Sequence, residues 1–179
     1  MQKNNMTRLQ IMILGVLSAF GPLALDLYLP GLPVLQRELH TTATMTQLSI
    51  TAAMFGLAIG QVVVGPLSDR LGRKMPLIYG IAAFTIASFG IAMSDNIGMI
   101  IVLRLIQGLG GATGIVLSLA MITDSFDGIQ LTRNVAINQT INGIFPILAP
   151  VLGGVLIALA DWRSAFWLLG GLGLIIVIL

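Results

Sequence analysis

Six apolar segments, separated by short polar connections, dominate the pattern of this chain. The first five run for about 20 residues or more, the length that an α-helix needs to cross a lipid bilayer. The sixth is shorter and reaches the last residue without a polar flank, so we interpret it as a span cut off by the chain end. The pattern predicts an all-α polytopic membrane protein, one six-helix bundle over residues 1–179, with spans at about 9–30, 45–67, 76–94, 97–121, 134–160 and 164–179.

A signal peptide is the alternative interpretation of the first segment. This segment is long for a signal peptide, contains Asp26 and lacks a small-residue cleavage site. We therefore expect it to be retained as the first span. Only the connections at 30–44 and 122–133 are long enough for a small surface turn or helix, so no soluble domain is expected between the spans.

The composition excludes a soluble globular domain and a disordered chain. Hydrophobic residues make up 56% of the chain and charged residues 9%, with a mean hydropathy of +0.99, whereas soluble domains carry about 25% charged residues. The absence of Cys removes disulfides and thiolate chemistry, and a single His leaves almost no material for a metal site. The basic residues are spread over the connections, which argues against nucleic-acid binding and for a lipid bilayer as the main partner.

The distribution of Lys and Arg predicts the orientation of the spans. With the N-terminus in the cytoplasm, the inner side carries most of the basic residues, as cytoplasmic connections usually do. The reverse orientation would place the basic cluster outside, so we expect a cytoplasmic N-terminus. The inner residues are then Lys3, Arg8, Arg70, Arg73, Lys74 and Arg133, and the outer residues are Arg37 and Arg163.

Two charged residues, Asp26 and Arg104, interrupt the apolar spans. A charge inside a span costs about 2.5–3.5 kcal/mol on insertion scales, so such residues are expected to be paired or to face a wet cavity. With a rise of about 1.5 Å per residue, Asp26 lies about 25 Å from the inner end of its span, and Arg104 lies about 10 Å from the outer end of its own. Both therefore lie in the outer half of the membrane, where the geometry allows a direct pair or a shared aqueous pocket.

The helix faces that carry these two charges are small or polar, which favours packing against other helices over contact with lipid. For Arg104 the alternatives are a structural ion pair and a proton- or substrate-linked group, and the depth of the charge favours the second. Asp26 has a further alternative as a cap at the outer interface, because Pro30 follows closely. The face of Asp26 comprises Pro22, Ala19, Ser18 and Gly15, and the face of Arg104 comprises Gln107, Gly108, Gly111, Gly114 and Ser118.

The fifth segment combines two amides, two prolines and two glycines. The amides are one turn apart on one helix face. Prolines remove backbone hydrogen bonds, so two of them four residues apart predict a marked bend, and the glycines beyond permit close packing. A simple packing kink and a kinked helix that lines a moving cavity both remain open. The residues are Asn138, Asn142, Pro146, Pro150, Gly153 and Gly154.

No group of residues in the sequence predicts an enzyme. The glycine-rich run at 108–114 is similar in composition to a phosphate-binding loop, but that loop requires a preceding strand and a soluble βαβ unit. The run lies inside an apolar span, so we assign it to helix packing. His40 lies in an outer connection and the carboxylates do not cluster, so neither a catalytic set nor a metal site is expected.

Four stretches of the chain resemble the major facilitator superfamily. Residues 65–74 read Gly-Pro-Leu-Ser-Asp-Arg-Leu-Gly-Arg-Lys, similar to the signature loop of that superfamily, and residues 104–112 resemble its R-x-x-q-G-x-g-a motif. Residues 143–154 are similar to the antiporter motif of drug exporters, except that Ala149 stands where the motif has Gly. Residues 26–33 resemble the twelve-span drug:proton antiporters and, together with 149–154, look most like the bicyclomycin-resistance (Bcr/CflA) group.

The resemblance implies the six-helix N-terminal half of a transporter in a bacterial inner membrane. In this reading the inner loop is a gate, in which Asp69 contacts the other half of the transporter and Arg73 pairs with Asp124 at the inner end of the fourth span. The gating residues are Gly65, Asp69, Arg70, Gly72, Arg73 and Asp124.

The resemblance also implies a coupling site. Asp26 would take a proton or a cationic drug, and Arg104 would bias proton uptake, with Gln107, Asn138 and Asn142 completing the set. No cofactor is implied, since a proton gradient would supply the energy.

The implied function is proton-coupled efflux of small drug-like molecules by alternating access. The implied partners are protons, a small-molecule substrate, and a missing C-terminal six-helix half or a second copy. The alternatives are a metabolite transporter of the same superfamily and a non-transporting half that acts as a structural partner.

Overall fold

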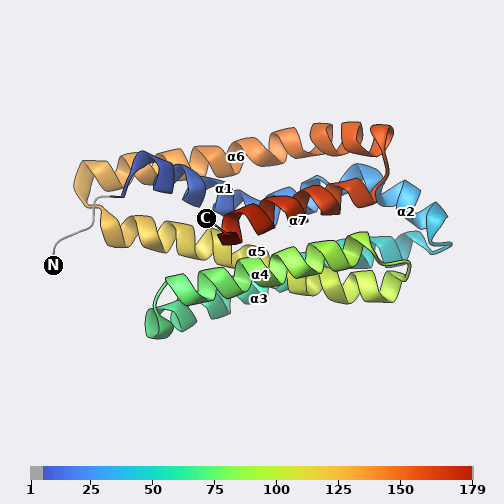
Figure 1. Cartoon of the computed structure of the whole chain (residues 1–179), viewed down its shortest axis with the longest axis horizontal. Coiled ribbons are helices and arrows are strands. Elements are labelled where there is room, and N and C mark those ends of the chain that lie inside the picture. Colours follow the sequence, from blue (N-terminus) through green and yellow to red (C-terminus); the bar gives the residue numbers. More distant parts are fainter. Residues whose placement is uncertain (1–5, 179) are drawn as a thin grey trace.

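The computed structural model describes residues 6–178, and the regular structure of this part of the chain is entirely helical (Figure 1). Lys3 and Leu179, which entered the sequence analysis, lie outside the described residues. The elements are α1 (Arg8–Asp26), the 3₁₀ turn η1 (Leu29–Gly31), α2 (Leu32–Glu38), α3 (Ala43–Leu71), α4 (Lys74–Ala92), α5 (Ile97–Ser125), α6 (Gly128–Leu159) and α7 (Arg163–Ile178).

Each predicted apolar segment corresponds to one main helix. Within the described residues, five helical stretches are long and apolar enough to cross a membrane, and α7 is a shorter apolar helix. The predicted connection at 30–44 contains the small helix α2, as expected. The connection at 122–133 is instead absorbed by the ends of α5 and α6, which leave only Phe126 and Asp127 between them. Gly128, with φ +55°, permits the reversal at this point.

Local sequence signals set several helix boundaries. Thr7 forms a capping box with Gln10 at the start of α1, and the side chain of Asn96 accepts hydrogen bonds from two backbone N–H groups at the start of α5. Between α3 and α4, Gly72 has φ +83°, a conformation that side chains with a Cβ rarely adopt. Gly72 therefore permits the tight reversal that brings α4 back along α3.

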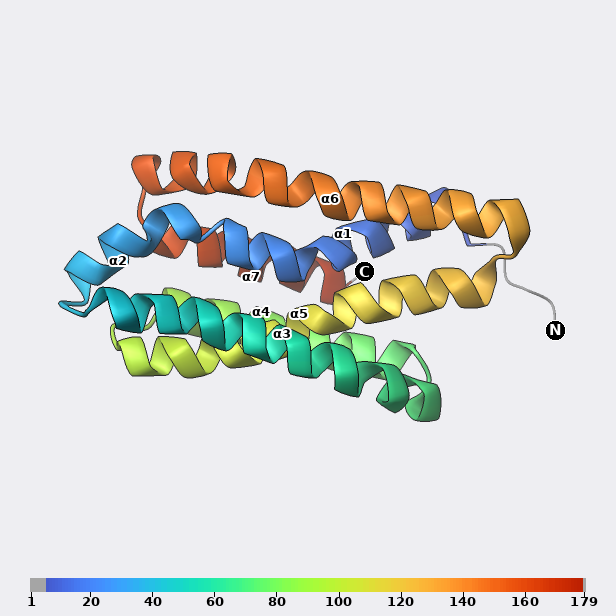
Figure 2. The same ribbon diagram turned by 180° about the vertical axis from the view of Figure 1, so that it is seen from behind.

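The fifth span lacks the marked bend that the prolines predicted. α6 is one uninterrupted helix with Pro146 and Pro150 inside it, and Figures 1 and 2 show only a gentle curve. Beyond the prolines, Gly153 lies directly against the backbone of Leu27, the residue that caps the end of α1. This close contact holds the second part of α6 along α1 and limits the bend that the lost hydrogen bonds allow.

Helix α5 lies at the centre of the bundle and contacts α1, α3 and α4. Figures 1 and 2 show α6 along one long side, α3 and α4 along the opposite side, and α5 crossing obliquely between them. The predicted small and polar face of α5 is buried along its whole length, as expected for a packing face. A Cβ on Gly108 would meet the backbone of Ala53 in α3, and one on Gly114 would meet the backbone of Leu17 in α1.

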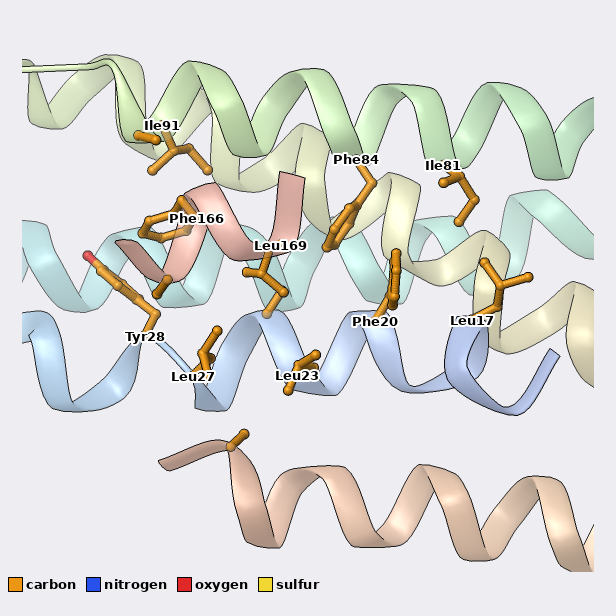
Figure 3. Close-up of a cluster of buried hydrophobic side chains, with 14 of the residues drawn as sticks. Leu17, Phe20, Leu23, Leu27, Tyr28, Ile81, Phe84, Ile91, Phe166 and Leu169 are labelled. Atoms are coloured by element: carbon orange, nitrogen blue, oxygen red, sulfur yellow. The ribbon is translucent and has the colours of Figure 1, made fainter. Parts of the chain in front are cut away.

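The apolar core lies between α1, α4 and α7 (Figure 3). Phe20 of α1 and Phe84 of α4 stack with ring centroids 5.2 Å apart. Figure 3 also shows Tyr28 and Phe166 close together, near the end of the bundle that carries α2, which we call the α2 end. By contrast, α3 and α6 expose long apolar faces. Among the helices long enough to cross a membrane, the stretch that contains α1 is the most buried.

A methyl group at the α3–α5 crossing should destabilise the fold. In Gly108→Ala the new Cβ meets backbone atoms that cannot rotate away, and overpacking of this kind costs about 1–3 kcal/mol. Gly143→Ala is the matched control, because no atom lies within 4 Å of its added Cβ and alanine gains about 1 kcal/mol of helix propensity over glycine. We expect a lower melting temperature in detergent for Gly108→Ala only, and equal melting temperatures would contradict the described crossing.

Candidate functional site

The guanidinium of Arg104 is completely buried within the bundle. Its Nη1 donates hydrogen bonds to the backbone carbonyl of Ala24, at 2.9 Å, and to Oε1 of Gln107, at 2.8 Å. Gln107 in turn donates from Nε2 to Oγ of Ser88 on α4, at 2.8 Å, and Ser88 donates to the carbonyl of Phe84. One continuous chain of hydrogen bonds therefore joins α1, α5 and α4 through a charge that lies in an apolar environment.

Two aromatic rings pack against the same guanidinium. Its Cζ lies 4.7 Å from the ring centroid of Tyr28 and 5.5 Å from that of Phe166, distances at which the ring faces attract a cation. The two rings contact each other with centroids 5.1 Å apart (Figure 3), and the hydroxyl of Tyr28 lies 3.3 Å from Oγ of Ser49 on α3. Nε and Nη2 of Arg104 have no hydrogen-bond partner among the described residues. The rings therefore surround a charge whose hydrogen-bonding capacity is only partly used.

Asp26 does not pair with Arg104 within the described part of the chain. Arg104 binds the carbonyl of Ala24 instead, and Asp26 is the last residue of α1, partly buried, two positions further on. Of the two arrangements that the sequence allows, a direct pair and a shared pocket, the direct pair is absent from the described residues, and a main-chain contact takes its place. α1 ends at Asp26 and the chain then turns into η1, so the part of this helix end that Arg104 contacts is the carbonyl of Ala24.

The two amides on α6 lie at a different depth from Arg104. Asn138 is buried and Asn142 is partly buried, and both have a side-chain atom without a hydrogen-bond partner in the described part of the chain. Ile141 faces Gly15 of α1, and Gly15 precedes Ala24 by nine positions, or roughly 13 Å along the helix. The structure therefore does not bring Asn138 and Asn142 together with Arg104 and Gln107.

At the end of the bundle opposite α2, Arg73 holds two acidic residues. Its Nη1 lies 2.5 Å from Asp69, and its Nε donates to Oδ2 of Asp124 at 3.0 Å, so the ion pair that the resemblance implied is present. Nη1 also donates to Oγ of Ser68. The hydrogen bond to Asp124 raises the pKa of the Arg73 guanidinium, which keeps it charged at any physiological pH. Ser68 in turn donates to the carbonyl of Gly65, which ties this predicted gate residue to the cluster, and Gly72 forms the turn that leads to Arg73. Arg70, the remaining predicted gate residue, has no ion pair within the described residues.

A second cluster, which the sequence did not predict, lies at the α2 end. Arg163, the first residue of α7, forms ion pairs with one acidic residue from each of three separate connections. Its guanidinium also lies over the ring of Trp162, with Cζ 4.4 Å from the centroid, and Trp162 donates from Nε1 to Glu38 at 2.7 Å. We call this group the Arg163 cluster; it comprises Glu38, Asp95, Asp161, Trp162 and Arg163.

One signal in the sequence could have indicated the Arg163 cluster. Each of the three predicted outer connections carries one acidic residue, whereas only two basic residues, Arg37 and Arg163, lie on that side. Charged side chains at one membrane surface often form ion pairs with opposite charges at that surface, but the sequence does not indicate which residues pair. The aromatic partners of Arg104 and the serine partner of Gln107 had no comparable signal.

Comparison with known proteins identifies the family. Residues 12–179 match the family model described as Major Facilitator Superfamily. The chain belongs to this superfamily. Its members are transporters and not enzymes, and with five helices able to cross a membrane the chain is a multi-pass membrane protein.

Three relatives show how much of such a protein this chain spans. It is 38% identical over 169 residues to "Uncharacterized MFS-type transporter YdgK" of Bacillus subtilis, covering 93% of this chain and 42% of that protein. It is 29% identical to "Bicyclomycin resistance protein homolog" of Haemophilus influenzae (98% and 44%) and 32% identical to "Chloramphenicol resistance protein" of Pseudomonas aeruginosa (92% and 39%). The chain therefore spans about two-fifths of the length of these relatives.

Removing the central cation of the Arg163 cluster should destabilise the α2 end. In Arg163→Met, Glu38 and Asp161 lose their common partner; their side chains are 41% and 39% exposed, and the loss of an ion pair at such a site costs about 0.2–1 kcal/mol. Arg37→Met is the matched control, because among the described residues the Arg37 side chain bonds only the carbonyl of Pro33 in its own helix. We expect the melting temperature in detergent to fall for Arg163→Met and to change little for Arg37→Met. Equal shifts would mean that the cluster adds nothing to stability.

Proposed function

We propose that this chain is the N-terminal half of a proton-coupled transporter that exports small drug-like molecules from a bacterial cell by alternating access. The observation that carries the proposal is the completely buried Arg104. A charge inside a membrane-spanning helix is costly and is usually found where ions, protons or substrates pass. The names of two relatives, which refer to bicyclomycin and chloramphenicol resistance, favour drugs as the substrate class.

The arrangement around Arg104 supports a role in proton coupling. Asp26 lies two residues after the carbonyl that Arg104 binds, at the point where α1 ends. A carboxylate that gains or loses a proton here changes the charge next to a fixed cation, and therefore changes the relative energies of two conformations of the bundle. In the proposal Asp26 carries the proton, Arg104 favours its release, and Gln107 holds Arg104 in place.

The charge clusters at the two ends suit a protein that opens alternately to each side. We assign the Arg73 end to the cytoplasm, because the connections there carry most of the basic residues. Arg73 joins the α3–α4 connection to the end of α5, so a change at this cluster reaches α5, the helix that carries Arg104. The cluster would act as the inner gate, and Asp69 would meet the other half when that gate closes.

The proposal requires a second six-helix unit, and the outer faces of α3 and α6 suit one. Both helices expose polar side chains among their apolar residues, for example Gln47 and Gln61 on α3 and Gln139 on α6. Lipid disfavours such groups, whereas another helical unit or a water-filled cavity between the units would accept them. The second half of the same protein is the natural occupant, and a second copy of this chain is the alternative.

Replacing the proposed proton carrier should abolish coupled efflux. In cells that express the gene encoding this chain, Asp26→Asn should reduce drug efflux by about tenfold or more, because an amide cannot exchange a proton. In inverted membrane vesicles, drug addition should release protons with the wild-type protein and not with the variant. The readouts are accumulation of a fluorescent drug and quenching of a pH-sensitive dye.

Asp95→Asn is the matched control, since it removes one mostly exposed carboxylate near the same end of α1. It should leave efflux close to the wild-type level. Unchanged efflux in Asp26→Asn would contradict the assignment of Asp26. A screen in which the wild-type protein moves a metabolite and no drug would replace the substrate class.

A further inference from the structure

The Arg163 cluster is connected to Arg104 through aromatic rings. Glu38 accepts a hydrogen bond from Nε1 of Trp162 at 2.7 Å, and the ring of Trp162 meets the edge of Phe166 with centroids 6.0 Å apart. The ring of Phe166 lies 5.5 Å from the guanidinium carbon of Arg104. Trp162 and Phe166 are both fully buried. The path therefore runs from a charged group at one membrane surface to the charge inside the bundle without passing through solvent.

We propose that Phe166 and Trp162 are positioning residues for Arg104, anchored at the α2 end by Glu38. Hydrogen bonds hold only Nη1 of Arg104, on one side of the guanidinium, while Nε and Nη2 have none in the described part of the chain. The ring faces of Tyr28 and Phe166 therefore fix the plane of the guanidinium. The hydroxyl of Tyr28 lies next to Ser49, which anchors that ring, whereas Phe166 packs against the rings of Tyr28 and Trp162.

The packing makes this connection a mechanical one. Close-packed side chains move between discrete arrangements and do not deform continuously. A displaced Trp162 would require Phe166 to change its position, and Phe166 cannot move without changing the face that it presents to Arg104. The connection at the α2 end and the intramembrane cation then form one coupled unit, and a change at either site alters the other by the same free energy.

This inference builds on the proposed function, because it concerns the residue assigned there to proton coupling. The coupling between Trp162 and Arg104 is nevertheless a property of the folded chain and can be measured without transport. A chain that shows the coupling but does not export drugs would contradict only the proposed function, and one that exports drugs without the coupling would contradict only the inference.

The chain has two tryptophans, which gives a direct readout. Trp167 is about half exposed at 49%. Trp167→Phe therefore leaves the buried Trp162 as the single source of tryptophan fluorescence. In this background we expect Arg104→Gln to shift the Trp162 emission to longer wavelength and to increase its quenching by acrylamide. Arg70→Gln is the matched control: it removes an exposed Arg at the opposite end and should leave both signals unchanged.

The intermediary is tested by repeating the comparison with Phe166 altered. In Phe166→Leu the ring is lost, so Arg104→Gln should no longer change the Trp162 signals. Phe166→Tyr keeps the ring face and should restore the response. Arg104→Lys keeps the charge but lacks the planar group that stacks on aromatic rings. It should therefore also shift the Trp162 emission. If Arg104→Gln does not fold, Arg104→Lys replaces it in the comparison.

Two results would overturn the proposal. One is a folded, monodisperse Arg104→Gln or Arg104→Lys chain whose Trp162 emission and quenching match those of the parent. The other is a response that persists unchanged in Phe166→Leu, which would mean that the two sites communicate by another route. Glu38→Gln removes the charged acceptor of the Trp162 hydrogen bond and should shift the emission in every background, which verifies that the reporter is sensitive.

Discussion

A guanidinium without exposed surface lies inside the bundle, and the packing around it compensates for this costly position. Arg104 is held by a main-chain carbonyl of α1, a glutamine of its own helix and two aromatic rings from α1's end and α7. Removing an ion from water costs several kcal/mol even after the protein relaxes. Hydrogen bonds and ring faces recover part of that cost, and no acidic residue within the described part of the chain forms an ion pair with Arg104.

Close approach of the helices is the condition for this arrangement. The carbonyl of Ala24 can reach Arg104 only because α5 presents small residues to α1, with Gly111 against Gly21 and Gly114 against the backbone of Leu17. Larger side chains at these positions would separate the two helices and leave the guanidinium without its main-chain acceptor. Other glycines of α5 bring α3 and α4 close in the same way, with Gly108 against the backbone of Ala53 and Gly110 against that of Gly80. Packing of this kind takes the place of the hydrophobic driving force that is absent between helices in lipid.

The charges at the two membrane surfaces follow a common plan. In each case one arginine at the start of a helix collects acidic residues from elements far apart in the sequence: Arg73 binds Asp124, and Arg163 binds Glu38 and Asp95. These clusters fasten the ends of a bundle whose interior is held by close packing and by the hydrogen bonds of Arg104 and Gln107. The Arg163 cluster also reaches inward through Trp162 and Phe166, whereas the Arg73 cluster is connected to Arg104 along the axis of α5.

The sequence by itself determined the helices, because a backbone in lipid must satisfy its hydrogen bonds within each span, and apolar length then fixes the number and approximate bounds of the helices. It also determined the packing face of α5, since small and polar residues recur there with helical spacing, and its motifs indicated the Arg73–Asp124 pair. Only the tertiary structure decided that Arg104 binds the carbonyl of Ala24 and two rings, and that three acids meet at Arg163. Carbonyls and ring faces carry no sequence pattern, and which of them meet depends on the depth and rotation of helices that lie far apart along the chain.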